Sequence, residues 1–392
     1  MTSVSTIQPQ LLSQLNERSV LRVLQSNGPS SRAEVTRQLG VTAPTVSKAV
    51  ASLLRSGLLE EIEAPGAGRG RPAKRLRLAT RTAQVLGLVI DARRCCVASA
   101  GLEGALIPEH DTLFETPSTY EALIDSTVAH ISEILSERSS ASIQTLGLGI
   151  SMPGLIDSRE QRGVLSPNVS ITNGHAPGRD LTDRLGIPAV LLQECHALCL
   201  AEKHYGNARD LDDFAMLDAT TGVGLAVMSG GRILTGNSGL AGELGHLPID
   251  TAGELCGCGR FGCLETLASD SALARRVSRR LNRTLSIDQI VSEVSSEQLD
   301  VTQELSDVLP KLAFALATVV NLFNPSTLFI FSRLLEIDES VFDRLVKLTE
   351  SLALKPSFEK CRIERARGNK REGAIAGIIE HLTASRVQSE ET

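Results

Sequence analysis

One histidine and three cysteines form the densest group of potential metal ligands in the sequence. His246 is followed after nine residues by Cys256, Cys258 and Cys263, and the segment that holds the cysteines is rich in glycine. Three thiolates and one imidazole complete the tetrahedral shell that Zn²⁺ prefers, and they leave no position open for water. The spacing therefore predicts a structural zinc site rather than a catalytic one. The alternative is a set of unliganded thiols beside a core histidine.

A second group of residues has the character of a DNA-binding surface. Residues 1–80 carry 11 Lys and Arg against 5 Asp and Glu, a net charge of +6, whereas the rest of the chain carries 29 against 41, a net charge of −12. A basic segment on an acidic body suits a partner with a phosphate backbone. Within this segment we expect Thr45, Ser47 and Lys48 to contact base edges of double-stranded DNA.

Two arginines lie in a segment of glycine and proline. Residues 65–72 read Pro-Gly-Ala-Gly-Arg-Gly-Arg-Pro, which places Arg69 and Arg71 on a flexible tip. Arginine side chains are attracted into narrow minor grooves, and flanking glycines allow a close approach to DNA. The segment therefore predicts a wing that presents both arginines to DNA. The alternative is a basic linker between domains.

The elements around these residues predict a winged helix-turn-helix. Apolar residues at helical spacing predict three helices, and a strand flanks each side of the tip. The predicted helices span residues 10–25 and 43–56, with a short helix between them that is capped by Ser30 or Ser31 and runs to Leu39. The predicted strands span 58–62 and 75–78. Ser31 and Glu34 have the spacing of a capping box, Gly40 ends the second helix, and Thr42 is the expected N-cap of the third. The elements occur in the order that this fold requires.

The chain from about residue 81 onward alternates strands and helices. Two sets of elements each begin with a pair of strands, which predicts two α/β lobes with a ligand-binding cleft between them. The predicted strands span 85–91, 95–100, 145–151, 189–193, 214–219, 224–228 and 327–331, and the predicted helices 120–137, 194–205, 303–323 and 340–352. We expect domains at 1–80, 81–194 and 195–372, with a C-terminal helix over 373–386 that packs back on the first lobe.

The zinc motif and several shorter segments together resemble the ROK family of repressors, open reading frames and sugar kinases. The segments that carry the resemblance are Leu240–His246 (LAGELGH), Cys256–Glu265 (CGCGRFGCLE), Leu148–Asp157, Ser166-Pro-Asn168 and the stretch from Ala201-Glu202 to Gly206. The similarity covers essentially residues 84–384. The N-terminal segment resembles that of the repressor branch.

The resemblance implies a duplicated, actin-like fold of the RNase H-like, sugar-kinase type, with a sugar bound between the lobes. It also implies that zinc supports the loop that bears Glu243 and His246. By matching positions, the sugar contacts would be Asn168, Glu243, His246 and Glu265, with Glu194 at the position of the kinase base. Carboxylates and amides hydrogen-bond sugar hydroxyls and discriminate against ligands that leave them unpaired. The alternative for Glu243 and Glu265 is helix capping or exposure at the surface.

The resemblance to kinases is incomplete where a nucleotide would bind. The first phosphate loop of the family reads Asp-x-Gly-Gly-Thr-Lys, whereas residues 91–95 here read Asp-Ala-Arg-Arg-Cys and lack the glycines whose N–H groups wrap a phosphate. The kinase Asn-Asp pair is Gln193-Glu194, and Glu194 is one methylene longer than the aspartate base. The second phosphate loop is partly kept at residues 220–224, and a late Gly-Gly is replaced by Ser332-Arg333. We therefore predict no enzymatic activity and no ATP binding.

The predicted function is a transcription regulator, most simply a repressor, of carbohydrate-related genes. A homodimer or a dimer of dimers would bind a pseudo-palindromic operator, and a sugar or sugar derivative would change the operator affinity. The alternatives are a sugar kinase with degenerate nucleotide motifs and a DNA-binding regulator with a vestigial sugar pocket. Neither an apolar run of about 18 residues nor a secretory signal at Met1–Leu12 is evident in the sequence, so we expect a cytoplasmic protein without a membrane partner.

Overall fold

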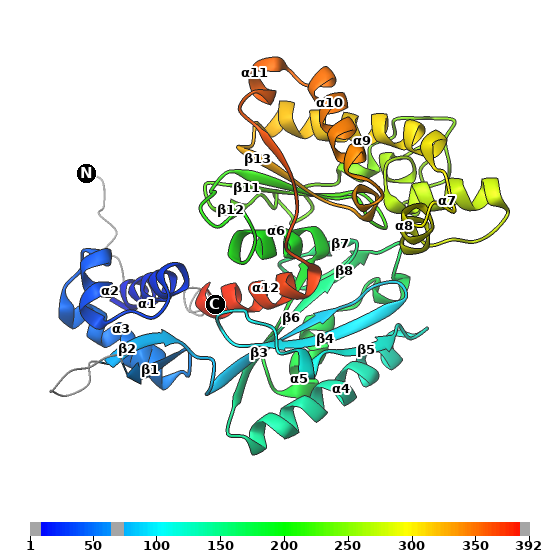
Figure 1. Cartoon of the computed structure of the whole chain (residues 1–392). Coiled ribbons are helices and arrows are strands. Elements are labelled where there is room, and N and C mark those ends of the chain that lie inside the picture. Colours follow the sequence, from blue (N-terminus) through cyan, green and yellow to red (C-terminus); the bar gives the residue numbers. More distant parts are fainter. Residues whose placement is uncertain (1–8, 64–73, 385–392) are drawn as a thin grey trace, which may run out of the picture. The chain divides into compact units, whose positions relative to one another are not determined.

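The structure is a computed structural model that describes residues 9–63 and 74–384 (Figure 1). The chain divides into two compact units. Unit 1 comprises Met1–Ser151, Gly178–Val190 and Ala374–Thr392, and unit 2 comprises Met152–Pro177 and Leu191–Gly373. The chain therefore passes between the units four times. The three predicted domains, with boundaries at residues 80 and 194, stay a prediction, and in this division the N-terminal elements belong to unit 1.

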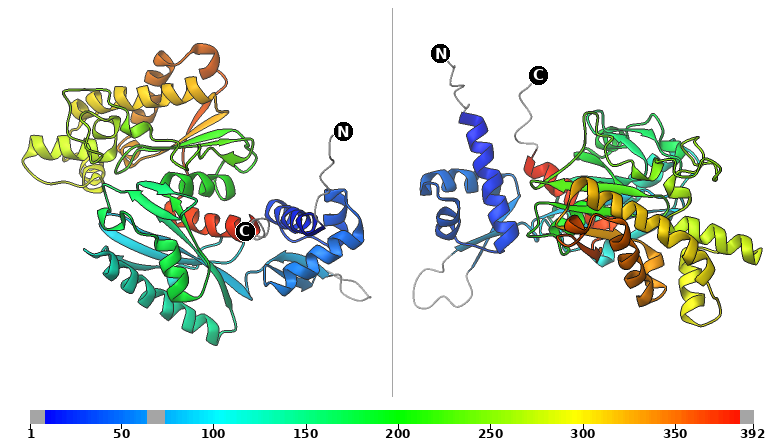
Figure 2. Two further views of the ribbon diagram at one scale, coloured as in Figure 1. Left: turned by 180° about the vertical axis from the view of Figure 1, so that it is seen from behind. Right: turned by 90° about the horizontal axis from the view of Figure 1, so that it is seen from above.

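Unit 1 begins with the predicted winged helix-turn-helix, which Figure 2 shows from two sides. Its elements are α1 (Pro9–Asn27), α2 (Arg32–Leu39), α3 (Ala43–Arg55), β1 (Leu59–Glu63) and β2 (Lys74–Leu78). The helices share an apolar core because Val35 of α2 and Val46 and Val50 of α3 are fully buried. The two strands pair antiparallel. Ser30, just before α2, adds a backbone bridge to Leu76 of β2 and ties the helices to the hairpin.

The turn between α2 and α3 follows the sequence prediction except at one side chain. The Ser31 hydroxyl accepts a hydrogen bond from the Glu34 N–H, and the Glu34 carboxylate accepts one from the Ser31 N–H, which completes the capping box. Gly40 ends α2 with a φ of 64°, in the left-handed region that favours glycine. Thr42 is the N-cap residue of α3, but its side chain makes no capping bond. Its hydroxyl pairs instead with the Thr45 hydroxyl, at 2.9 Å.

Two five-stranded sheets have the same topology. In each sheet the first three strands along the chain form an antiparallel meander, and the fourth joins the first in parallel. The first sheet has the order β5-β4-β3-β6-β9 and the second β12-β11-β10-β13-β14. Their strands are β3 (Ala83–Val89), β4 (Arg94–Ala100), β5 (Thr112–Glu115), β6 (Gln144–Met152), β9 (Ala189–Gln193), β10 (Phe214–Asp218), β11 (Gly224–Ser229), β12 (Arg232–Ile233), β13 (Thr327–Phe331) and β14 (Arg362–Arg365). This repetition confirms the predicted duplication.

Helices and one further hairpin complete the two units (Figure 1). The helices are α4 (Tyr120–Ser140), α5 (Pro177–Leu185), α6 (Glu194–His204), α7 (Asp270–Leu281), α8 (Ile287–Ser295), α9 (Thr302–Phe323), α10 (Glu339–Leu352), α11 (Lys355–Phe358) and α12 (Lys370–Ala384). The hairpin pairs β7 (Leu155–Asp157) with β8 (Arg162–Leu165). The division between the units falls inside α12, because Gly373 belongs to unit 2 and Ala374 to unit 1.

Helix α9 forms the centre of the unit 2 core. Leu309, Leu312, Leu316 and Val320 are fully buried along its inner face. By length and composition alone this helix is apolar enough to cross a membrane, but 56% of its most apolar window is buried inside the protein. This burial is typical of the core helix of a globular domain.

Candidate functional site

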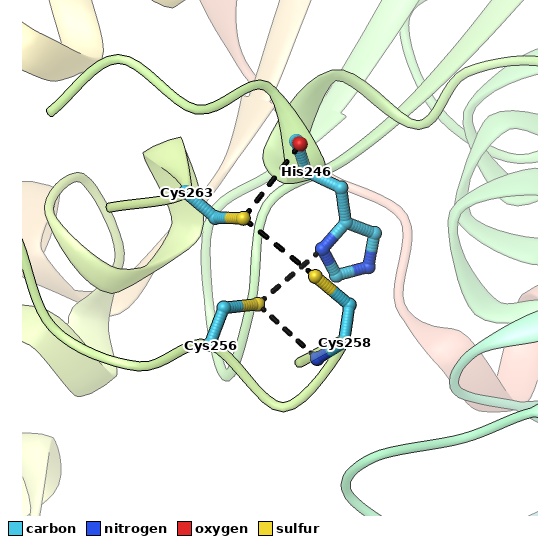
Figure 3. Close-up of side chains that lie close together, drawn as sticks. All are labelled: His246, Cys256, Cys258 and Cys263. Atoms are coloured by element: carbon cyan, nitrogen blue, oxygen red, sulfur yellow. Dashed lines mark hydrogen bonds between the residues drawn. The ribbon is translucent and has the colours of Figure 1, made fainter. Parts of the chain in front are cut away.

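The four predicted metal ligands come together in unit 2 (Figure 3). One donor atom from each of His246, Cys256, Cys258 and Cys263 lies within 4.8 Å of all the others. The Sγ atoms of Cys258 and Cys263 are 3.7 Å apart, and Cys256 Sγ lies 3.5 Å from His246 Nδ1. A tetrahedral Zn²⁺ with Zn–S bonds of about 2.3 Å and a Zn–N bond of about 2.0 Å needs S···S and S···N separations of about 3.8 and 3.5 Å. The donor set therefore fits a zinc ion.

Close backbone packing positions the cysteine loop. An isolated β-bridge joins Pro248 to Cys263. Gly262 has a φ of 64°, and a Cβ built there would lie 1.4 Å from the carbonyl oxygen of Asp250. Only glycine satisfies both the backbone conformation and this contact. The loop geometry that gathers the thiols therefore depends on glycine positions between them.

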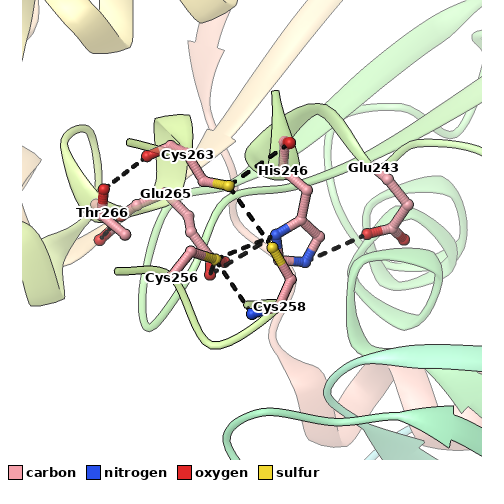
Figure 4. Close-up of polar contacts among 8 residues, drawn as sticks. Glu243, His246, Cys256, Cys258, Cys263, Glu265 and Thr266 are labelled. Atoms are coloured by element: carbon pink, nitrogen blue, oxygen red, sulfur yellow. Dashed lines mark hydrogen bonds and ion pairs between the residues drawn. The ribbon is translucent and has the colours of Figure 1, made fainter. Parts of the chain in front are cut away.

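Two carboxylates flank the imidazole of His246 (Figure 4). Glu243 Oε2 lies 3.8 Å from His246 Nε2, and Glu265 Oε1 lies 3.8 Å from Nδ1. Glu265 Oε1 also lies 2.9 Å from Cys256 Sγ. Nδ1 is the ring nitrogen that faces the thiols, so Nε2 faces Glu243. A carboxylate next to the second ring nitrogen orients a metal-bound histidine. The structure thus brings together three of the five predicted sugar-site residues.

Burial and charge act in opposite directions on these groups. Burial raises the pKa of Glu243, while His246 and a hydrogen bond from Gln193 lower it. Gln193 Nε2 donates to Glu243 Oε1 at 3.0 Å. Burial also raises the pKa of the Cys256 thiol, and Glu265 adds to this effect. A coordinated metal cation has the opposite effect, because a thiol that binds it is deprotonated.

Glu194, at the position of the kinase base, forms a buried ionic contact. Lys370 Nζ donates to Glu194 Oε2 at 2.6 Å and lies 3.6 Å from Asp218 Oδ2. Each of the three side chains is less than one-fifth exposed. Sequence reasoning missed Lys370 and Asp218 as site residues. Lys370 is 176 residues from Glu194, so no local sequence pattern connects them. For Gln193, the only indication in the sequence is its position next to Glu194.

Asn168 lies in the same unit, next to a residue that packs on the cysteine loop. Asn168 is exposed. A Cβ built on Gly257 would lie 2.4 Å from Cβ of Pro167, so these two backbone segments are in close contact. The Ser166 hydroxyl accepts a hydrogen bond from the Val169 N–H at 3.2 Å and fixes the turn. A contact between Asn168 and a sugar stays a prediction.

Three of the five predicted DNA contacts lie on α3. Ser47 and Lys48 are exposed, and Thr45 is half-buried. The opposite face of α3 is buried in the core of the head, so α3 presents a polar face outward. Arg69 and Arg71 lie outside the described residues. DNA contacts of all five side chains stay a prediction.

Comparison with known proteins identifies relatives of both parts. The model of the ROK family matches residues 92–379, and the model of the MarR family matches residues 14–70. The chain is 26% identical over 355 residues to the DNA-binding transcriptional dual regulator NagC of Escherichia coli (strain K12), covering 88% of this chain and 87% of NagC. It is 25% identical over 334 residues to the xylose repressor of Bacillus subtilis (strain 168), covering 84% of this chain and 85% of that repressor.

Solved structures share the fold. A crystal structure of a ROK family transcriptional regulator, described as a homolog of the E. coli MLC protein, matches with a TM-score of 0.82 and 23% identity, over 96% of this chain and 99% of that chain. The ROK family glucokinase from Streptomyces griseus, in complex with glucose and AMPPNP, matches with a TM-score of 0.66 and 21% identity, over 75% of this chain and 97% of that chain. Regulators and kinases therefore share this architecture. Because the ROK model matches well over half of its 392 residues, the chain belongs to the ROK family.

Proposed function

We propose that this chain is a sequence-specific DNA-binding transcription regulator, most simply a repressor of carbohydrate-related genes, whose operator affinity is changed by a sugar or sugar derivative. The observation that carries the proposal is the union, in one chain, of a winged helix-turn-helix and a ROK domain with polar residues gathered around a Cys–His cluster. Relatives named as repressors that align over more than four-fifths of the chain support it.

In the proposed complex α3 is the recognition helix. Its first turns carry Thr45, Ser47 and Lys48, and the N-terminal residues of a recognition helix are those that meet base edges in the major groove. Arg69 and Arg71 would bind the adjacent minor groove. A homodimer or a dimer of dimers would present two such heads to a pseudo-palindromic operator in the cytoplasm.

The effector is proposed to bind in unit 2. Asn168, Glu194, Glu243, His246 and Glu265 offer amide, carboxylate and imidazole groups to sugar hydroxyls. The Cys–His cluster would hold a structural zinc ion, which supplies a fixed tetrahedral anchor for the loop between Glu243 and Glu265. Gln193 and the imidazole then hold the Glu243 carboxylate in place, since both lie against its oxygens. Such positioning lowers the entropy lost when a sugar binds.

A sugar kinase is the second candidate, because the turn of the second phosphate loop is kept. The Thr220 N–H and hydroxyl both donate to Asp218 Oδ1, at 3.0 and 2.6 Å. Two observations weigh against it. Exposed Arg93 and Arg94 stand where the family's glycines wrap a phosphate. The Lys370 ammonium is paired with Glu194, the residue at the base position. We therefore propose that the chain binds no ATP.

DNA selection from a random-sequence library tests the proposal. We expect the protein to enrich one pseudo-palindromic sequence, and Lys48→Ala to weaken its binding. Thermal melting with D-glucose, D-xylose, N-acetyl-D-glucosamine and the 6-phosphates of the hexoses then identifies the effector as the compound that raises the Tm. Enrichment of no sequence would contradict the DNA-binding function. ATP consumption with any of these sugars, lost in Glu194→Gln, would favour the kinase.

A further inference from the structure

Helix α12, drawn in red in Figure 1, begins at Lys370. Its residues up to Gly373 belong to unit 2 and those from Ala374 onward to unit 1. Its first residue carries the ammonium that binds Glu194 at 2.6 Å. Asp218 Oδ2 is a buried oxygen without a hydrogen-bond partner and lies 3.6 Å from Lys370 Nζ. Two carboxylates thus face one ammonium in a site that is less than one-fifth exposed. In such surroundings a charge–charge contact is weakly screened by solvent.

Helix α6 holds the start of α12 tightly. The buried Glu202 carboxylate accepts hydrogen bonds from the N–H groups of Arg367 and Gly368, at 2.8 and 2.9 Å. A Cβ on Gly373 would lie 2.2 Å from the carbonyl oxygen of Ala197, so α12 and α6 touch along their backbones. The close packing leaves little free space between the two helices, so a movement of Glu194, the first residue of α6, also displaces the start of α12.

The remainder of α12 is equally tightly packed within unit 1. A Cβ on Gly149 of β6 would lie 1.8 Å from the Ala374 carbonyl oxygen. Ile375, Ile378 and Ile379 are fully buried, and they belong to the same hydrophobic cluster as the core residues of α1, α2 and α3. One helix therefore carries the ionic contact of Glu194 at its start, and three of its isoleucines belong to the hydrophobic cluster that also contains the core of the DNA-binding head.

We propose that Lys370 is a positioning residue that couples occupancy of the effector site to the DNA-binding head through α12. The inference rests on the proposed function, because it takes Glu194 as a contact of the effector. A sugar hydroxyl that donates to Glu194 shares or displaces the Lys370 ammonium, which then moves toward Asp218. Because α6 and the start of α12 are closely packed, the two helices respond to this change together. The effector shifts the operator affinity by as much as its affinity differs between the two arrangements of this pair.

Breaking the pair without any sugar tests the coupling directly. The operator Kd is measured by fluorescence anisotropy for the full-length wild-type chain, Glu194→Gln, Lys370→Met and the double variant. Each single variant is expected to change the Kd by about fivefold or more in the same direction, as coupled sites do. The double variant is expected to change the Kd no further, because both substitutions remove the same contact. Lys370→Arg keeps the charge and should retain the wild-type Kd more closely than Lys370→Met.

Lys203→Met is the matched control. Lys203 also forms an ion pair in unit 2, at 3.2 Å from Asp212, and its ammonium donates to the Leu211 carbonyl rather than to Glu194, so its removal should leave the operator Kd unchanged. Thermal melting of every variant shows that it is folded, and Glu194→Gln, which preserves the side-chain size, carries the test if Lys370→Met unfolds. The coupling would be wrong if both single variants had the wild-type Kd, or if their effects were additive in the double variant. In either case DNA binding by the wild-type chain would still support the proposed function. Absence of sequence-specific binding by the wild-type chain would instead overturn the proposed function, and the coupling with it.

Discussion

The buried carboxylate of Glu202 offers a sharp test of how α6 holds the start of α12. Its side chain is 0% exposed. Oε1 accepts a hydrogen bond from the Asn207 N–H at 2.6 Å, and Oε2 accepts from the Arg367 and Gly368 N–H groups. Glutamine at this position keeps one acceptor oxygen. If that oxygen faces Arg367 and Gly368, the new amide NH₂ meets the Asn207 N–H, so one bond is lost and two donors face each other.

The expected cost follows from these contacts. An unsatisfied buried donor costs about 1–3 kcal/mol, and a lost bond to a charged acceptor about 1.5–3 kcal/mol, so we expect Glu202→Gln to lower the free energy of unfolding by about 2–4 kcal/mol. For a unit of about 210 residues this corresponds to a fall in Tm of roughly 5–15 °C in scanning calorimetry. Glu359→Gln is the control, because Glu359 is 62% exposed. A Tm of Glu202→Gln within about 1 °C of wild type would show that the hydrogen bonds of the Glu202 carboxylate do not stabilise this unit.

Three further predictions concern the metal, the DNA contacts and the pH dependence. Metal analysis is expected to find one zinc per chain, and Cys258→Ser or a strong chelator should remove it and lower the Tm; full stability without metal would contradict a structural role. Lys48→Ala should weaken binding of the selected DNA sequence by about 1–3 kcal/mol if Lys48 contacts a base. Arg69→Ala combined with Arg71→Ala should reduce the dependence of the affinity on salt concentration, and an unchanged dependence would contradict the predicted wing. Burial lowers the pKa of His196 to about 4, so the unfolded state binds more protons than the folded state between pH 6.5 and 4. Stability is therefore lost as the pH falls through this window. The loss should be smaller in His196→Leu, and an equal loss in the variant would show that His196 is not its source.

Much of the fold follows from local sequence patterns. The capping box at Ser31 and Glu34 and the glycine at Gly40 set the ends of α2 through contacts between residues three or four positions apart, which a sequence reveals directly. The strand β13 was predicted at its observed bounds because its residues form one short apolar run bounded by turn residues. The Cys–His cluster was predictable because structural zinc sites are built mainly from cysteine and histidine, and here these residues lie at short spacing.

Other elements were not predicted. The helices α5, α7, α8 and α11 were missed, although α8 begins with a capping box at Ser286 and Gln289. The short strands β5, β7, β8, β12 and β14 were missed because two to four residues are too few to show a period. The C-terminal helix was predicted to begin at residue 373 but begins at Lys370. Those first residues are polar, and contacts with distant segments hold them rather than an apolar pattern. Lys370 binds Glu194 and lies near Asp218, and Glu202 binds Gly368 just before the helix. Tertiary contacts therefore decided the one element that carries the proposed coupling.

One titration tests directly whether a sugar changes the affinity of this protein for its operator. The selected DNA duplex is titrated with the full-length protein, with and without a saturating concentration of the compound that raises its Tm. We expect the compound to change the Kd for this duplex by at least about fivefold. Equal Kd values with and without the bound compound would contradict a sugar-responsive regulator.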